Sequence, residues 1–178
     1  MKLTLEYLTN DLHACREGVA WWEKQNEPDS LKVLELLIDQ GHWDWFRWLA
    51  VRLMTHQQKV EWACYCAEQV LSIFEKKYPQ DQRPRKAIEA AREWLKNPSE
   101  ATRKAAAAAY AAADYAAYAA AADAAYAAAA AADAASAAAA ADAAADYAAD
   151  AYAADDAKNK IRRQLANQAI VILKDGQR

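Results

Sequence analysis

The chain contains little glycine, proline or cysteine: 3 Gly, 4 Pro and 3 Cys among 178 residues. Glycine and proline mark turns and irregular loops, so their scarcity favours long regular elements over a loop-rich fold. Glycine-rich phosphate loops, serine-centred nucleophile elbows and paired-histidine zinc motifs are missing from the sequence. We therefore expect a protein with no catalytic residues, no metal and no cofactor.

The three cysteines do not indicate a disulfide framework or a metal site. Residues 1–10 lack the basic start and apolar run of a signal peptide, so reduced thiols in a cytoplasmic protein are expected. Cys64 and Cys66 are two positions apart, which on a helix turns the thiols about 200° away from each other. Such thiols cannot share a tetrahedral ion, and we expect all three to be structurally inert.

Residues 105–157 lack lysine, arginine, histidine, cysteine, glycine and proline altogether, and consist of 38 Ala, 8 Asp, 6 Tyr and 1 Ser. Alanine has the highest helix propensity, so this tract should be helical. A single helix over the Gly- and Pro-free residues 99–175 would be about 110 Å long. We therefore expect at least one turn inside the tract, with Asp123, Asp133 and Asp142 as candidate helix caps.

Basic residues are missing from this tract but not from the rest of the chain. Residues 1–104 carry 16 basic and 16 acidic residues, and residues 158–178 carry six basic residues against Asp175. The net charge of -3 argues against a nucleic-acid partner, because such a partner favours a net basic face. The recurring Asp residues also exclude a membrane span through the tract.

The first hundred residues have helical periodicity interrupted by clear stop signals. Helices are predicted over about 4–24, from Asp29 or Ser30 to Gly41, over 43–54 and 57–77, and from about residue 83 to Asn97-Pro98. In the third, Trp45, Trp48, Leu49 and Leu53 are predicted to face inward. The fold class is all-α, a multi-helix bundle in which a Trp-rich domain of residues 1–98 packs with an Ala-rich helical region of residues 99–178.

Seven tryptophans lie among charged residues in the first domain, and Trp and Arg are enriched at binding hot spots. The alternative is that the Trp residues form the core and the charges pair around it, which we favour for most of them. Two candidate partner-binding faces follow, one on the acidic helices and one on the Arg/Trp surface. The candidate residues are Asp133, Asp142, Asp146, Asp150, Trp21, Asp44, Arg52, Arg83 and Arg85.

Four motifs then occur in one order and carry a resemblance. They are Ala14-Cys15-x-Glu17-Gly18-x-x-Trp21, Gly41-His42-x-x-Trp45-x-x-Trp48-Leu49-x-x-Arg52, Ala63-Cys64-x-Cys66-Ala67 and Arg83-Pro84-Arg85-x-Ala87-Ile88-Glu89-Ala90-Ala91. Over residues 7–95 the chain resembles the bacterial and phage putative immunity protein family described as Imm5-like, whose members often end in Ala-rich helices. The resemblance implies an all-α, non-enzymatic protein that neutralises a toxin by binding it, and it carries over no catalytic residues.

From these observations we expect a cytoplasmic, non-catalytic protein of the immunity type, whose partner is a protein toxin or effector. One alternative is a phage-encoded inhibitor of a host defence complex that uses an acidic helical surface. Another is a structural role for a long Ala-rich helical scaffold. No membrane or nucleic-acid partner is expected.

Overall fold

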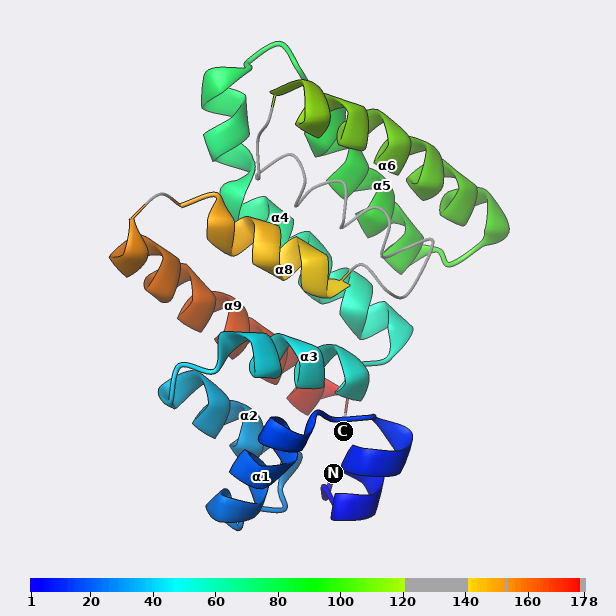
Figure 1. The fold of residues 1–178 in the computed structure, drawn as a ribbon. Coiled ribbons are helices and arrows are strands. Elements are labelled where there is room, and N and C mark those ends of the chain that lie inside the picture. The colour runs from blue at the N-terminus through cyan, green and yellow to red at the C-terminus, as the bar shows by residue number, and fades with distance from the viewer. Residues whose placement is uncertain (121–140, 153, 177–178) are drawn as a thin grey trace. The chain divides into compact units, whose positions relative to one another are not determined.

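The computed structural model describes residues 1–120, 141–152 and 154–176, and the regular elements among them are all helical, which confirms the all-α fold class. The chain divides into two compact units, Met1–Leu53 and Met54–Arg178 (Figure 1). The compositional boundary near residue 98 falls between two helices of the second unit. A domain division at that point stays a prediction.

The first unit contains a five-residue π-helical turn and three α-helices. They are η1 (Tyr7–Asp11), α1 (Arg16–Gln25), α2 (Ser30–Asp39) and α3 (Trp43–Leu53). The N-terminal segment lies against the start of α2, where Leu3 N–H donates to the Pro28 carbonyl at 2.7 Å. Leu3, Leu8, Val33 and Leu37 are buried in this unit.

The helix predicted over residues 4–24 is wrong in one respect, because the chain breaks between η1 and α1. His13 has a left-handed φ of 54°, and Cys15 is extended and caps α1, with its sulfur accepting from Gly18 N–H at 3.3 Å. In the segment before the break, Leu8 is buried, whereas Leu5 is 47 % exposed. The helical spacing of apolar residues in the sequence continues across the break, but the burial of those residues does not follow this spacing.

The start of α2 and the end of its last turn agree with the sequence prediction. The Asp29 carboxylate accepts from Leu31 and Lys32 N–H, both at 3.1 Å, and so caps the helix. Gly41 has a φ of +78°, the left-handed conformation that allows the chain to leave the helix at little cost. The caps therefore fix where α2 ends and where α3 can begin.

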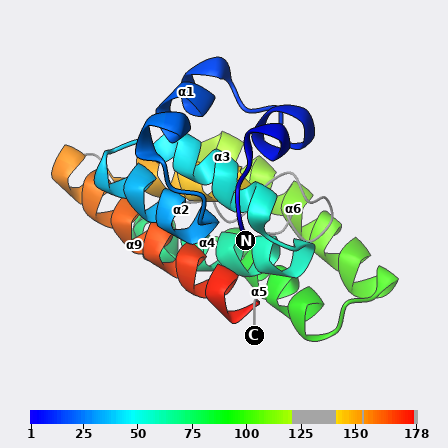
Figure 2. The ribbon, with the colours of Figure 1, turned by 90° about the horizontal axis from the view of Figure 1, so that it is seen from below.

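The second unit is built around α4 (His56–Lys77), which packs against three other helices, α5 (Arg83–Lys96), α8 (Ala141–Asp150) and α9 (Asp155–Asp175). The remaining described helix, α6 (Glu100–Ala120), packs on α5, and α8 also contacts α9. Figure 2 shows the same ribbon from below, with the long helices α6 and α9 in view. The first described part of the Ala-rich tract thus lies on α5, and the last part lies on α4.

Alanine allows α6 to approach α5 closely. Ala113 and Ala87 are both fully buried and belong to one apolar cluster, against which Ala109 and Tyr110 pack. Because protein interiors are closely packed, a larger side chain at a fully buried alanine is expected to require rearrangement of its neighbours. The alanine tract therefore supplies a thin packing face as well as helix propensity.

Two side chains of α4 hold the C-terminal helix through its backbone. The fully buried Trp62 donates from its indole nitrogen to the Leu165 carbonyl at 3.0 Å, and Gln58 Nε2 donates to the Ile172 carbonyl at 2.7 Å. Gln58 also completes a capping box with Thr55 at the start of α4. One glutamine thus joins the beginning of α4 to the end of α9.

The predicted turn candidates are placed only in part. Asp123 and Asp133 lie outside the described residues, and Asp142 lies within α8. A further break separates α8 from α9, where Ala154 is extended and precedes Asp155. No glycine or proline marks this break in the sequence, so it was not among the predicted turns.

Candidate functional site

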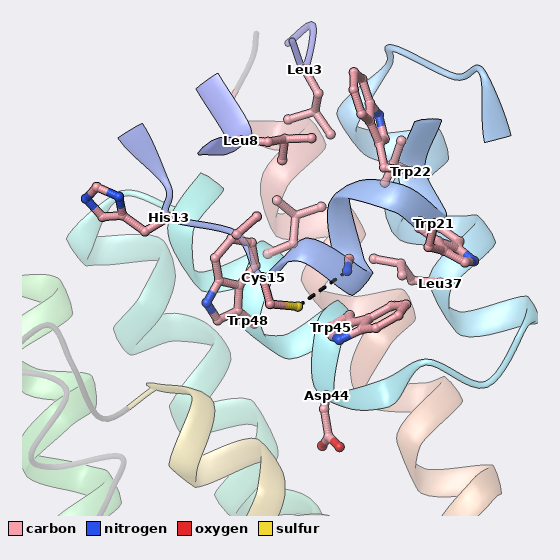
Figure 3. A pocket seen from close by; sticks show the side chains of 14 residues that line it. Leu3, Leu8, His13, Cys15, Trp21, Trp22, Leu37, Asp44, Trp45 and Trp48 are labelled. Atoms are coloured by element: carbon pink, nitrogen blue, oxygen red, sulfur yellow. Dashed lines mark hydrogen bonds between the residues drawn. The ribbon is translucent and has the colours of Figure 1, made fainter. Parts of the chain in front are cut away.

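An apolar pocket lies within the first unit, and its wall begins at the N-terminus of α1 (Figure 3). The Cys15 cap leaves little space beside Gly18, where an added Cβ would lie 3.3 Å from the Cys15 sulfur. One turn after this closely packed N-terminus, α1 carries the consecutive tryptophans Trp21 and Trp22. Both line the pocket.

The polar tips of these two tryptophans are already hydrogen-bonded. Trp21 Nε1 donates to Gln40 Oε1 at 2.8 Å, and Trp22 Nε1 donates to the Glu27 carbonyl at 2.9 Å. A hydrogen-bonded indole nitrogen no longer requires a partner from a ligand. Trp21 and Trp22 therefore offer the pocket mainly apolar ring surface.

Helix α3 supplies the opposite wall through Trp45 and Trp48, which are one turn apart and on the same face of the helix. The Trp45 ring stacks on His42 at 4.5 Å between centroids and lies 6.1 Å from the Trp21 ring. Trp45 and Trp48 are half-buried, whereas Trp43 is buried and stacks on Phe46 at 5.7 Å. The predicted inward face of α3 is therefore corrected in part: Leu49 is buried as predicted, but Trp43 enters the core, and Trp45 and Trp48 border the pocket.

The floor of the pocket is aliphatic and comes from the N-terminal segment, η1 and α2, including Leu3, Leu8 and Leu37. The cavity has a volume of about 300 Å³. Asp44 is the one carboxylate among its lining residues, and its side chain is 84 % exposed although Arg47 Nη2 lies 3.1 Å from Oδ1. The lining is therefore largely apolar, and its one carboxylate forms an ion pair with Arg47 at the surface.

Two of the predicted partner-binding residues, Trp21 and Asp44, thus line one pocket. A third, Arg52, does not line the pocket but contacts the lining residue Trp48. The Arg52 guanidinium lies 4.1 Å from the centroid of the Trp48 ring, and Nη1 donates to the Trp48 carbonyl at 3.0 Å. This cation–π contact and hydrogen bond fix the position of Trp48. Arg52 therefore acts on the pocket by holding one of its walls.

Arg83 and Arg85 belong to the second unit and are engaged in bidentate ion pairs. Arg83 binds the Asp81 carboxylate at 2.9 and 2.6 Å, and its hydrogen bond lowers the pKa of Asp81. Arg85 binds the Glu75 carboxylate at 2.7 and 2.8 Å. Pairs with this geometry fix the guanidinium groups, so these two arginines contribute to the local structure of α4 and α5.

The four acidic candidates are less fully placed. Asp133 lies outside the described residues, and of Asp142 only the backbone, within α8, is described. Asp146 is half-buried, and Asp150 is exposed with Lys158 Nζ 3.3 Å from its carboxylate. Lys158, in the first turn of α9 after Asp155 and Asp156, therefore pairs with the last residue of α8.

Three pocket residues, Cys15, Trp45 and Trp48, were not predicted as partner-binding residues. The spacing of Trp45 and Trp48 by three positions was interpreted as a core face. Trp43 and Trp45, two positions apart, cannot both face inward on one helical stripe, which indicated that one of them is partly exposed; that residue is Trp45. All three cysteines are free, and Cys64 and Cys66 are buried. Burial raises the pKa of Cys64 to about 12 and that of Cys66 well above its ordinary value, which makes both thiols poor nucleophiles.

Neither a metal centre nor a membrane span was found in the described part of the chain. Over residues 1–120, 141–152 and 154–176, histidine, cysteine and carboxylate side chains do not gather in threes as a metal ion would require. The helices in these ranges are also too short or too polar to cross a bilayer.

The chain matches the protein family described as "Imm-5 like putative immunity protein" over residues 49–174. Neither curated proteins nor solved structures yield a match. The family predicted from the sequence motifs is confirmed, but the matched range differs from residues 7–95. It includes the Ala-rich tract and excludes the motifs before Leu49. Since more than half of the sequence is matched, the chain belongs to the Imm-5 like putative immunity protein family.

Proposed function

We propose that this chain is a non-catalytic immunity protein that neutralises a protein toxin or effector by binding it directly. The family match over residues 49–174 is the observation that carries the proposal, because it spans α4, α5, α6, α8 and nearly all of α9. Reduced thiols are consistent with action in the cytoplasm, where disulfides are rare.

The environment of the titratable groups supports binding over catalysis. Among the described residues, the carboxylates and guanidinium groups with shifted pKa values are members of ion pairs, such as Arg92 with Glu68 and Asp81 with Arg83. The two thiols with raised pKa values are buried. Shifted values of this kind arise from structural pairing and burial, and they do not converge on one pocket with a nucleophile and a base.

The acidic-surface alternative, inhibition of a host defence complex, is supported by the exposed Asp150, Asp155 and Asp156 around the junction of α8 and α9. Lys158 offsets part of that charge through its contact with Asp150. The scaffold alternative requires an extended helix, whereas α6 and α8 are separate helices that pack on α5 and α4. Direct binding of a toxin therefore remains the function that the observations support best.

The proposal is tested by titrating the activity of a candidate toxin, encoded beside the gene for this chain, with the purified protein. A stoichiometric binder leaves no toxin activity at equimolar protein, and activity returns as soon as toxin is in excess. The two proteins should also elute together in size-exclusion chromatography. Complete inactivation of the toxin by one-tenth of an equivalent would indicate turnover and refute the non-catalytic function.

A further inference from the structure

The pocket of the first unit lies almost entirely outside the residues matched by the family. Of its lining residues, only Leu49 falls within residues 49–174. The family match therefore assigns no role to the pocket.

The pocket has the size and chemistry for one large apolar side chain. A cavity of about 300 Å³ is at the small end of the range for ligand pockets. Four indole rings and several aliphatic side chains line it, and the nitrogens of Trp21 and Trp22 already have acceptors. A polar occupant would lose its own hydrogen bonds to water with little replacement.

The charge of this unit indicates what accompanies the apolar group. Residues 1–53 contain nine acidic and six basic residues, a balance of -3, whereas residues 54–178 are neutral. Asp44 lies in the pocket wall and Glu17 is next to the lining residue Gly18. Each has an arginine nearby, Arg47 at 3.1 Å and Arg16 at 3.9 Å, but the carboxylates remain 84 % and 67 % exposed and so accessible to a further cation. Complementarity therefore favours a basic partner surface.

We infer that this pocket is the anchor site for one aromatic or branched aliphatic side chain of the protein partner, presented beside a basic residue that pairs with Asp44. The inference rests on the proposed function in that the partner is then the toxin. A buried apolar anchor with a charged neighbour at its rim is a common arrangement at the centre of protein interfaces.

Cys15 provides a reporter within the pocket itself. Cys15 is exposed and lines the cavity, and its sulfur accepts from Gly18 N–H at 3.3 Å. Figure 3 shows Cys15 among the side chains that line the pocket. Cys64 and Cys66 are buried, so alkylation of the folded protein should be confined to Cys15. Occupancy of the pocket can thus be measured without removing any of its walls.

The first experiment uses three capped tripeptides, Ac-Arg-Phe-Arg-amide, Ac-Arg-Ser-Arg-amide and Ac-Glu-Phe-Glu-amide. The rate of Cys15 alkylation by iodoacetamide and the indole N–H resonances of the ¹⁵N-labelled protein are followed with each peptide. The Arg-Phe-Arg peptide should slow alkylation and shift the Trp21 and Trp45 resonances, at concentrations at least tenfold below those of the other two. Equal effects of the three peptides, or no protection by Arg-Phe-Arg, would overturn the inference. Protection that grows with protein concentration alone would assign the pocket to a second copy and would also overturn it.

The second experiment uses the toxin identified by neutralisation. Reaction of Cys15 with N-phenylmaleimide places a phenyl ring in the pocket and should weaken toxin binding at least tenfold. The same treatment should leave the affinity of the Cys15→Ser variant where it was, because serine preserves the cap and cannot react. Asp44→Asn should slow association and reduce its salt dependence, while the exposed control Glu23→Gln on α1 should not.

The outcomes separate the two proposals. If the toxin is neutralised and the Cys15 adduct binds it with full affinity, the anchor site is refuted and the immunity function stands. If no toxin is neutralised but the Arg-Phe-Arg peptide protects Cys15, the immunity function is refuted and the chemistry of the pocket stands. Thermal unfolding of the adduct at the temperature of the unmodified protein excludes misfolding as the cause of lost binding.

Discussion

Replacing Gln58 tests whether one side chain couples the start of α4 to the end of α9. Its Oε1 accepts from Thr55 N–H at 2.9 Å, and its Nε2 donates to the Ile172 carbonyl at 2.7 Å. Each hydrogen bond contributes on the order of 1 kcal/mol to the free energy of unfolding. Gln58→Ala removes both and should destabilise the protein by about 2 kcal/mol.

The two contributions can be separated with Gln58→Glu. A glutamate at this position keeps the capping box with Thr55 but cannot donate to Ile172, and it places a negative charge beside that carbonyl. It should cost about 1 kcal/mol or slightly more, all of it from the tertiary contact. The neighbouring Gln57 is exposed, so Gln57→Ala should be within about 0.5 kcal/mol of the wild type.

The assay combines chemical unfolding with amide hydrogen exchange. Gln58→Glu should accelerate exchange in the last two turns of α9 more than in the first turn of α4, whereas Gln58→Ala should accelerate both. The space beside Gly176 is also filled by Gln58, with an added Cβ lying 3.1 Å from its Cδ. If Gln58→Glu unfolds at the wild-type denaturant concentration and leaves exchange in α9 unchanged, the coupling is refuted.

Three further predictions concern the thiols, one ion pair and the alanine face. A thiol reagent should modify one thiol per chain in the folded protein at neutral pH and three after unfolding. Cys64 and Cys66 should react only after unfolding because burial raises their pKa values, and a second reactive thiol in the folded protein would contradict their burial. The lowered pKa of Asp81 means that its pairing with Arg83 stabilises the fold above the unfolded carboxyl pKa of about 3.9 and is lost as the pH falls through the lower folded value. Arg83→Gln should therefore cost at most about 1 kcal/mol at pH 7 and flatten the acid side of the stability curve, as measured by urea unfolding from pH 7 to pH 2; an unchanged acid slope would exclude the contribution. Ala113→Leu should destabilise by about 1–3 kcal/mol, because Ala113 is fully buried against α5, while Ala105→Leu at an exposed position of α6 should be close to neutral; equal melting temperatures for the two variants would refute the proposed packing.

Part of the fold could be predicted because it depends on chemistry within a few residues. The side chains of Asp29 and Thr55 cap the helices that follow them, and Tyr78-Pro79 ends α4. Alanine propensity made the long tract helical in α6 and α8. Caps and propensities act over one helical turn, so they can be recognised without knowing what packs where.

The pocket could be predicted only in part, because its walls come from segments that are distant in the sequence. Trp21 and Asp44 were expected on a binding surface, but Trp45 was assigned to the core. Neighbouring tryptophans on one helix have the same hydrophobicity, and periodicity does not decide which of them meets another helix. Only the packing of α1 and α2 against α3 distinguishes Trp43 from Trp45.

The sequence by itself determined the helix type, most helix ends and the family to which the chain belongs, because local propensity, caps and motifs are written in consecutive residues. The tertiary structure decided the break between η1 and α1, the break before Asp155 and the choice of Ala113 as a buried residue. An alanine tract presents almost the same methyl surface on every side, so its sequence contains no apolar stripe that identifies the packed face. Burial there depends on which helix lies opposite, and that is a property of the assembled fold.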